Sequence, residues 1–73
     1  METAGKVFEL RDGVWKDLSI EENETFVPVV LYKNSPDFKK RVEILSAYQP
    51  ILSRPENCLI KHDGKIYQIK QAP

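Results

Sequence analysis

The 73-residue chain has few of the residues on which catalytic and metal sites usually depend. It has one cysteine, Cys58, and one histidine, His62, so these residue types alone provide neither an internal disulfide nor a four-ligand zinc site. Two of its three glycines follow aspartate in turn-like dipeptides, which leaves little flexible backbone for a phosphate-binding loop. The sequence therefore indicates a protein that is not an enzyme and needs no cofactor or metal ion.

The sequence also lacks an excess of either charge and any long apolar run. Eleven basic and eleven acidic residues give a net charge of zero, whereas a nucleic-acid binder normally carries a positive excess, so we expect no specific nucleic-acid binding. Nucleic-acid binding stays open as an alternative function only because aromatic residues on a small sheet can stack on bases. The longest apolar run, residues 26–32, is far below the roughly 20 residues of a membrane span. With a lone thiol and no apolar leader at its N-terminus, the protein is expected in the cytoplasm.

Two Asp-Gly dipeptides predict the most definite structure in the chain. Asp12-Gly13 and Asp63-Gly64 each separate two runs rich in β-branched or aromatic residues, the pattern of a hairpin closed by a type I′ turn. A two-residue loop at each turn sets the register of the pairs. In the first hairpin the expected pairs are Glu9 with Lys16 and Leu10 with Trp15. In the second they are Cys58 with Ile69, Ile60 with Tyr67, Lys61 with Ile66 and His62 with Lys65.

Between the hairpins, the sequence predicts an acidic connection and then a third strand. Residues 19–24 are dominated by glutamate, so we expect a solvated loop. Residues 25–32 are apolar and β-branched on both faces, which is typical of a strand. Pro28 cannot donate a ladder hydrogen bond, so it marks a sheet edge, a bulge or the unpaired side of that strand.

One helix start follows the third strand. The Ser-Pro-Asp tripeptide at residues 35–37 offers a capping hydroxyl, a proline suited to the first helical position and an acid at the positive end of the helix dipole. Apolar residues then recur at helical spacing, but residues 41–44 also alternate like a strand, so residues 41–48 are open between helix and strand. Pro50 ends any helix before it. We expect a short strand at residues 51–52 and a turn-rich connector at residues 53–57.

These elements predict one domain of the α+β class. Residues 1–5 are expected to be a flexible lead-in, and residues 6–73 form the domain. The expected architecture is a small antiparallel sheet, or an SH3-like partly open barrel, with two Asp-Gly hairpins and one short helix.

The candidate functional residues are those that a protein partner could contact. In an extended strand Cys58 and His62 lie roughly 13 Å apart, so they cannot form a nucleophile pair; we expect Cys58 in the core and His62 in solvent at its turn. The first hairpin has more apolar residues than one sheet face can bury, which favours Val7 and Trp15 as partner contacts, with a core role for Trp15 left open. The basic run either forms a solvated helix face or meets an acidic partner, and its residues are Lys39, Lys40 and Arg41.

Two resemblances extend this prediction. The ending Asp-Gly-Lys-Ile-Tyr-Gln-Ile at residues 63–69 is similar to the closing hairpin of tailed-phage head–tail adaptor and head-closure proteins. The size and single-domain make-up resemble small phage-encoded regulators that bind and inhibit a host enzyme, RNA polymerase in particular. The resemblance to the regulators implies a cytoplasmic protein that works as a monomer, and the resemblance to the adaptors implies a virion component that assembles as a ring oligomer. Light scattering would separate the two.

Overall fold

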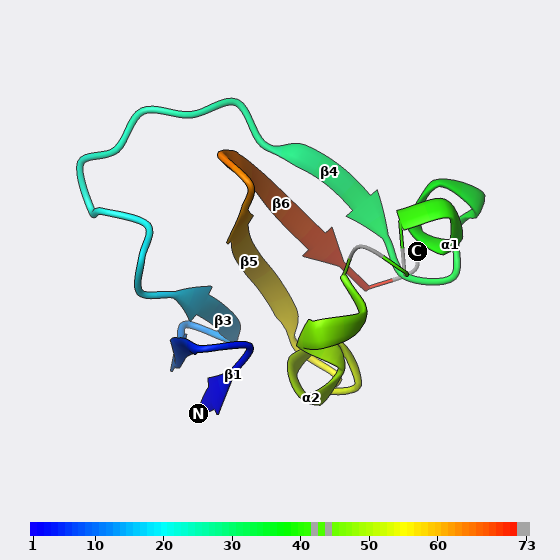
Figure 1. Cartoon of the computed structure of the whole chain (residues 1–73), viewed down its shortest axis with the longest axis horizontal. Helices are drawn as coiled ribbons and strands as arrows, with labels where there is room; N and C mark the ends of the chain where they lie inside the picture. The colour runs from blue at the N-terminus through cyan, green and yellow to red at the C-terminus, as the bar shows by residue number, and fades with distance from the viewer. Residues whose placement is uncertain (42, 44, 72–73) are drawn as a thin grey trace.

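The computed structural model describes residues 1–41, 43 and 45–71, and this part of the chain is mostly β (Figure 1). The strands are β1 (Glu2–Thr3), β2 (Lys6–Arg11), β3 (Val14–Asp17), β4 (Val29–Tyr32), β5 (Asn57–His62) and β6 (Lys65–Lys70). The helical segments lie between β4 and β5: α1 (Pro36–Arg41), the 3₁₀ helix η1 (Ser46–Tyr48) and α2 (Gln49–Leu52). The fold is thus broadly α+β.

Both Asp-Gly hairpins are present in the expected register. In β2–β3, Glu9 lies opposite Lys16 and Leu10 opposite Trp15. In β5–β6, all four expected pairs are formed. Each turn has positive φ at both central residues, 51° and 79° in the first and 53° and 77° in the second. Positive φ at these two positions is the requirement of a type I′ turn, and glycine meets it without strain.

The sheet is mixed, which corrects the antiparallel sheet expected from the sequence. Its strand order is β1-β2-β3-β5-β6-β4, with β3 parallel to β5 and β4 parallel to β6. Parallel neighbours need a crossover of a dozen residues or more, and residues 18–56 provide it between β3 and β5. The sheet ends in two different strands, β1 and β4, so it does not close into the SH3-like barrel.

The lead-in at residues 1–5 contains a strand that the sequence did not predict. β1 pairs with β2, with Glu2 opposite Val7 and Thr3 opposite Lys6. Ala4 and Gly5 have φ of 54° and 74°, so they make a third two-residue turn of the kind formed by the Asp-Gly pairs. The strand was missed because Ala-Gly is a weaker turn signal than Asp-Gly.

The third strand is shorter than predicted and lies at an edge of the sheet. β4 covers only Val29–Tyr32, and residues 25–28 of the predicted strand lie outside it. Among the described strands β4 pairs with β6 alone. Of the three positions that Pro28 allows, a sheet edge, a bulge or the unpaired side of the strand, the structure shows the edge. A proline next to an edge strand removes no hydrogen bond that the sheet needs.

The helix start is confirmed, and the short strand at residues 51–52 is wrong. α1 begins at Pro36, and the Ser35 hydroxyl accepts a hydrogen bond from the Phe38 amide at 3.1 Å, as a capping residue does. Of the ambiguous segment, residues 42 and 44 lie outside the described residues, and residues 46–48 form η1. Ile51 and Leu52 belong to α2. Pro50 is compatible with this helix because it lies in the first turn, where the amide hydrogen that proline lacks would have no partner within the helix.

The hydrophobic core lies on one face of the sheet, between the sheet and the segment that contains η1 and α2. From the helical side it contains Leu45, Tyr48, Ile51 and Leu52. From the sheet it contains Phe8, Leu31, Cys58, Ile60, Tyr67 and Ile69. The apolar face predicted for the second hairpin therefore forms part of the sheet side of the core. No helix in the described part of the chain has the length and apolarity to cross a membrane.

Candidate functional site

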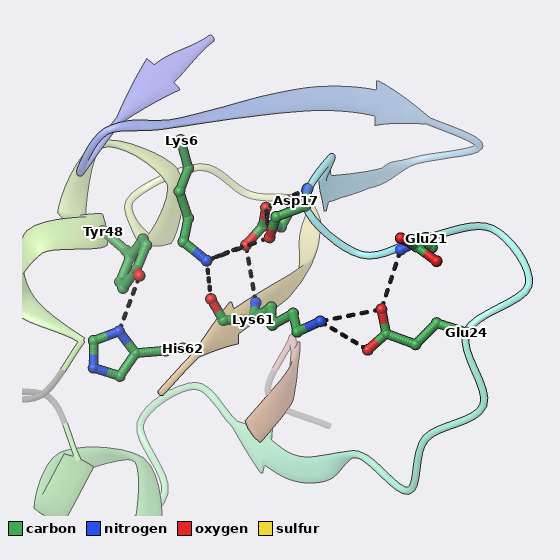
Figure 2. Close-up of polar contacts among 8 residues, drawn as sticks. Lys6, Asp17, Glu21, Glu24, Tyr48, Lys61 and His62 are labelled. Carbon is green, nitrogen blue, oxygen red and sulfur yellow. Dashed lines mark hydrogen bonds and ion pairs between the residues drawn. The ribbon is translucent and has the colours of Figure 1, made fainter. Parts of the chain in front are cut away.

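A polar cluster surrounds Asp17, the only buried charged residue in the described part of the chain (Figure 2). Its side chain is 0% exposed. One oxygen, Oδ2, accepts hydrogen bonds from Lys6 Nζ at 2.8 Å and from the Lys61 amide at 3.0 Å. The other, Oδ1, accepts from the Ser19 amide at 2.9 Å and the Ser19 hydroxyl at 2.7 Å. Both oxygens of the carboxylate are thus fully used within the chain.

The position of Asp17 at the end of β3 explains these contacts. β3 and β5 pair up to Lys16 and Leu59, and the Asp17 carboxylate then receives the amide of Lys61 two residues further along β5. Lys6 reaches across from β2 and donates to both the Asp17 carboxylate and the Lys61 carbonyl. A side chain therefore continues the parallel pairing and ties β2, β3 and β5 together.

The electrostatics of Asp17 favour its charged form. Burial by itself would raise the pKa of the carboxyl, but hydrogen bonds from Lys6, from the Ser19 side chain and from the Ser19 and Lys61 amides hold that pKa below its usual value. The sequence prediction missed this site. Its signal is the Asp-Leu-Ser tripeptide at residues 17–19, since aspartate commonly accepts a hydrogen bond from the amide two residues on.

The acidic connection is only partly the solvated loop that was expected. Glu21 and Glu22 are exposed. Glu24 is half-buried and lies 3.0 Å from Lys61 Nζ, and it also accepts a hydrogen bond from the Glu21 amide at 3.2 Å (Figure 2). The hydrogen bond from Lys61 lowers the pKa of Glu24 most, and the hydrogen bond from the Glu21 amide lowers it further. The connection is thereby fastened to β5.

His62 and Cys58 both have partners inside the chain. Nδ1 of His62 lies 3.0 Å from the hydroxyl of buried Tyr48, and the two rings meet edge to face (Figure 2). His62 is half-buried, so the expectation of a solvated turn histidine is wrong. Cys58 lies in the core as predicted, and burial raises the pKa of its thiol to about 11. A thiol in that state is a poor nucleophile at neutral pH.

Trp15 packs partly against the core and binds a neighbouring loop. Its indole Nε1 donates to the Glu56 carboxylate at 2.8 Å, and the Arg54 guanidinium lies 5.9 Å from the ring centre. Such a cation–π pair adds to the packing of the loop at residues 53–56. The core role left open for Trp15 is therefore real, while a role in contacting a partner remains a prediction.

Val7 lies on the other face of the same hairpin. Its neighbour Phe8 points into the core, so Val7 points away from it, as successive strand residues do. The Leu18 amide donates to the Val7 carbonyl at 3.0 Å, which continues the β2–β3 pairing and places the two side chains side by side. Val7 is 46% exposed and Leu18 is 41% exposed. We call these two residues the Val7–Leu18 patch.

The basic run lies far from this patch in the sheet. Lys39, Lys40 and Arg41 form the last turn of α1, which follows edge strand β4, whereas Val7 and Trp15 are on β2 and β3 near the opposite edge (Figure 1). Lys39 and Lys40 are exposed. The structure therefore places Val7 and Trp15 on one hairpin, on opposite faces, and places the basic residues on α1 after edge strand β4.

Within the described residues we find no pocket and no group of three or more acidic, histidine or cysteine side chains placed to hold a metal ion. Comparisons of the chain with protein-family models, with curated proteins and with solved structures found no match.

Proposed function

We propose that this chain is a small non-enzymatic protein-binding module that docks on its partner through the Val7–Leu18 patch. The observation that carries the proposal is the pair of adjacent, half-exposed aliphatic side chains on a rigid hairpin. Burying such a pair against a partner would contribute favourable hydrophobic free energy, and a rigid element would lose little entropy on binding.

The anchoring of the hairpin supports this role. Asp17 follows Lys16 at the end of β3 and is hydrogen-bonded to β2 and β5, so the patch sits on a part of the sheet that is held on both sides. Trp15 holds the loop at residues 53–56 on the core face of the same hairpin. A partner that covered the patch would meet a surface that is already ordered.

The chemistry of the reactive side chains agrees with binding rather than catalysis. The carboxylate of Asp17 is saturated with hydrogen bonds, the thiol of Cys58 is buried, and the ring of His62 is held by Tyr48. Each of these groups has a structural task that accounts for its position.

The resemblance to small phage-encoded regulators makes host RNA polymerase the first candidate partner. The test measures the affinity of the chain for immobilised, purified bacterial RNA polymerase. The variants Val7→Lys and Leu18→Lys are compared with the wild type. Val27→Lys is the matched control, because Val27 is 93% exposed and lies outside the patch. We expect each patch variant to weaken binding by about tenfold or more and the control to bind like the wild type.

Two results would contradict different parts of the proposal. If the polymerase does not bind at all, the partner is wrong, and the same variants then test the patch in a pulldown from the native host. If a partner binds and the patch variants bind it equally well, the patch is wrong. Circular dichroism of every variant separates loss of binding from loss of fold.

A further inference from the structure

The outer edge of β4 is an exposed pairing edge. In the described sheet β4 has a neighbour on one side only, and Figure 1 shows α1 beyond its C-terminal end rather than along its outer side. Val30 and Tyr32 are 44% and 42% exposed. Edge strands with free backbone groups readily pair with another strand unless something prevents it.

The direction of each backbone group on β4 follows from one hydrogen bond. The Lys33 amide donates to the Lys70 carbonyl of β6 at 2.9 Å, so it points inward. Backbone groups alternate along a strand, so the amide and carbonyl of both Val30 and Tyr32 point outward. The carbonyl of Pro28 points outward by the same alternation, and Pro28 has no amide hydrogen. The outward carbonyl of Tyr32 already accepts the Ser35 amide at 3.0 Å.

We propose that two copies of this chain form a two-fold symmetric dimer in which their β4 strands pair antiparallel, with Val30 opposite Val30 of the second copy. In this register the two Val30 residues exchange two hydrogen bonds. The amide of Tyr32 then faces the carbonyl of Pro28 in the second copy, and the symmetric bond forms as well. Pro28 of the second copy has no amide hydrogen to donate to the Tyr32 carbonyl. That carbonyl needs none, because it already accepts a hydrogen bond from the Ser35 amide of its own chain. Every outward group of β4 is thus satisfied.

The residue that leads into β4 fits the same arrangement. Val27, two residues before β4, is 93% exposed, and the second copy would cover it.

The dimer is independent of the proposed binding site. β4 and the β1–β2 end are opposite edges of the sheet, so pairing at β4 leaves the Val7–Leu18 patch open. The dimer is a closed pair, and therefore differs from both the monomer expected of a regulator and the ring expected of an adaptor. Because the shared edge is only four residues long, we expect a weak dimer that forms at roughly 0.1–1 mM.

Two measurements on the whole chain test the dimer. Sedimentation equilibrium from roughly 10 μM to 1 mM gives the association constant. Amide hydrogen exchange at the two ends of that range shows which groups are covered. We expect the exchange of the Val30 and Tyr32 amides to slow by about tenfold at high concentration, and that of Leu31, which bonds to β6, to stay constant.

The deciding variant is Val30→Pro, with Val30→Thr as its control. Proline at an outward position of an edge strand removes the shared amide and leaves the bonds to β6 intact. We expect Val30→Pro to weaken association by at least tenfold and Val30→Thr to associate like the wild type, with both folded by circular dichroism. A wild-type chain that stays monomeric at roughly 1 mM overturns the proposal. So does a dimer in which the Val30 amide exchanges freely. Should Val30→Pro fail to fold, the exchange data alone decide.

Discussion

Asp17 is the buried polar side chain whose removal should destabilise the domain most. In Asp17→Ala the amides of Ser19 and Lys61 lose their acceptor, and the ammonium of Lys6 loses its counter-charge. Breaking a buried ion pair on one side costs about 3–5 kcal/mol, and a small domain has only about 5–15 kcal/mol in total. In a chain of this length each kcal/mol shifts the melting temperature by roughly 4–8 °C, so we expect a fall of about 12 °C or more.

The assay is thermal unfolding followed by circular dichroism, with Asp63→Asn as the control. Asn-Gly closes a type I′ turn as well as Asp-Gly does, so the control should stay within about 0.5 kcal/mol of the wild type. The folded-state pKa of Asp17 is lowered, so its contribution is present above the unfolded pKa of about 3.9 and is lost as pH falls through the folded value. Asp17→Asn should therefore lose less stability between pH 5 and pH 2 than the wild type. A melting temperature for Asp17→Ala within about 2 °C of the wild type would refute the reasoning.

Three further predictions concern single sites. Gly64→Val should cost about 1–3 kcal/mol, because φ is +77° and an added Cβ meets no atom within 4 Å, so backbone strain alone acts; urea denaturation that matches the wild type would show a different turn. The Cys58 thiol, with its pKa of about 11, should react with a disulfide reagent at pH 8 only after unfolding, and rapid labelling of the folded chain would contradict its burial. Tyr48→Phe should lower the free energy of unfolding by about 1 kcal/mol through loss of the hydrogen bond to His62, and an unchanged urea midpoint would show that the bond contributes nothing.

The sequence predicted the parts of the fold that depend on neighbouring residues. Both Asp-Gly hairpins and their registers follow from turn chemistry and from the pairs that a two-residue loop imposes. The capped start of α1 is local in the same way. The parallel pairs β3–β5 and β4–β6 were not predicted, because they join segments separated by dozens of residues and no local pattern specifies them. The apolar pair at residues 51–52 is too short for its period to separate helix from strand.

The candidate site was predicted to a similar extent. Cys58 was placed in the core correctly because it shares a strand face with apolar residues. His62 was placed wrongly because its partner, Tyr48, comes from the helical segment across the core. Asp17 was missed because its burial results from the contact of β3 with β5, which only the tertiary structure brings about. Residues are thus predictable where their partners lie in the same hairpin.

The separation of the two hairpins along the chain has a consequence for folding kinetics. Val14 and Asn57, which begin the β3–β5 pairing, are 43 positions apart (57 − 14), whereas each hairpin closes over two residues. Hairpins form in roughly 1–10 μs. Closing a long loop is slower, because the chain loses conformational entropy before the stabilising contacts form. We therefore expect the rate-limiting step to be the meeting of two preformed hairpins, so that a mutation in the β3–β5 contact slows refolding and one in the β4 edge mainly speeds unfolding.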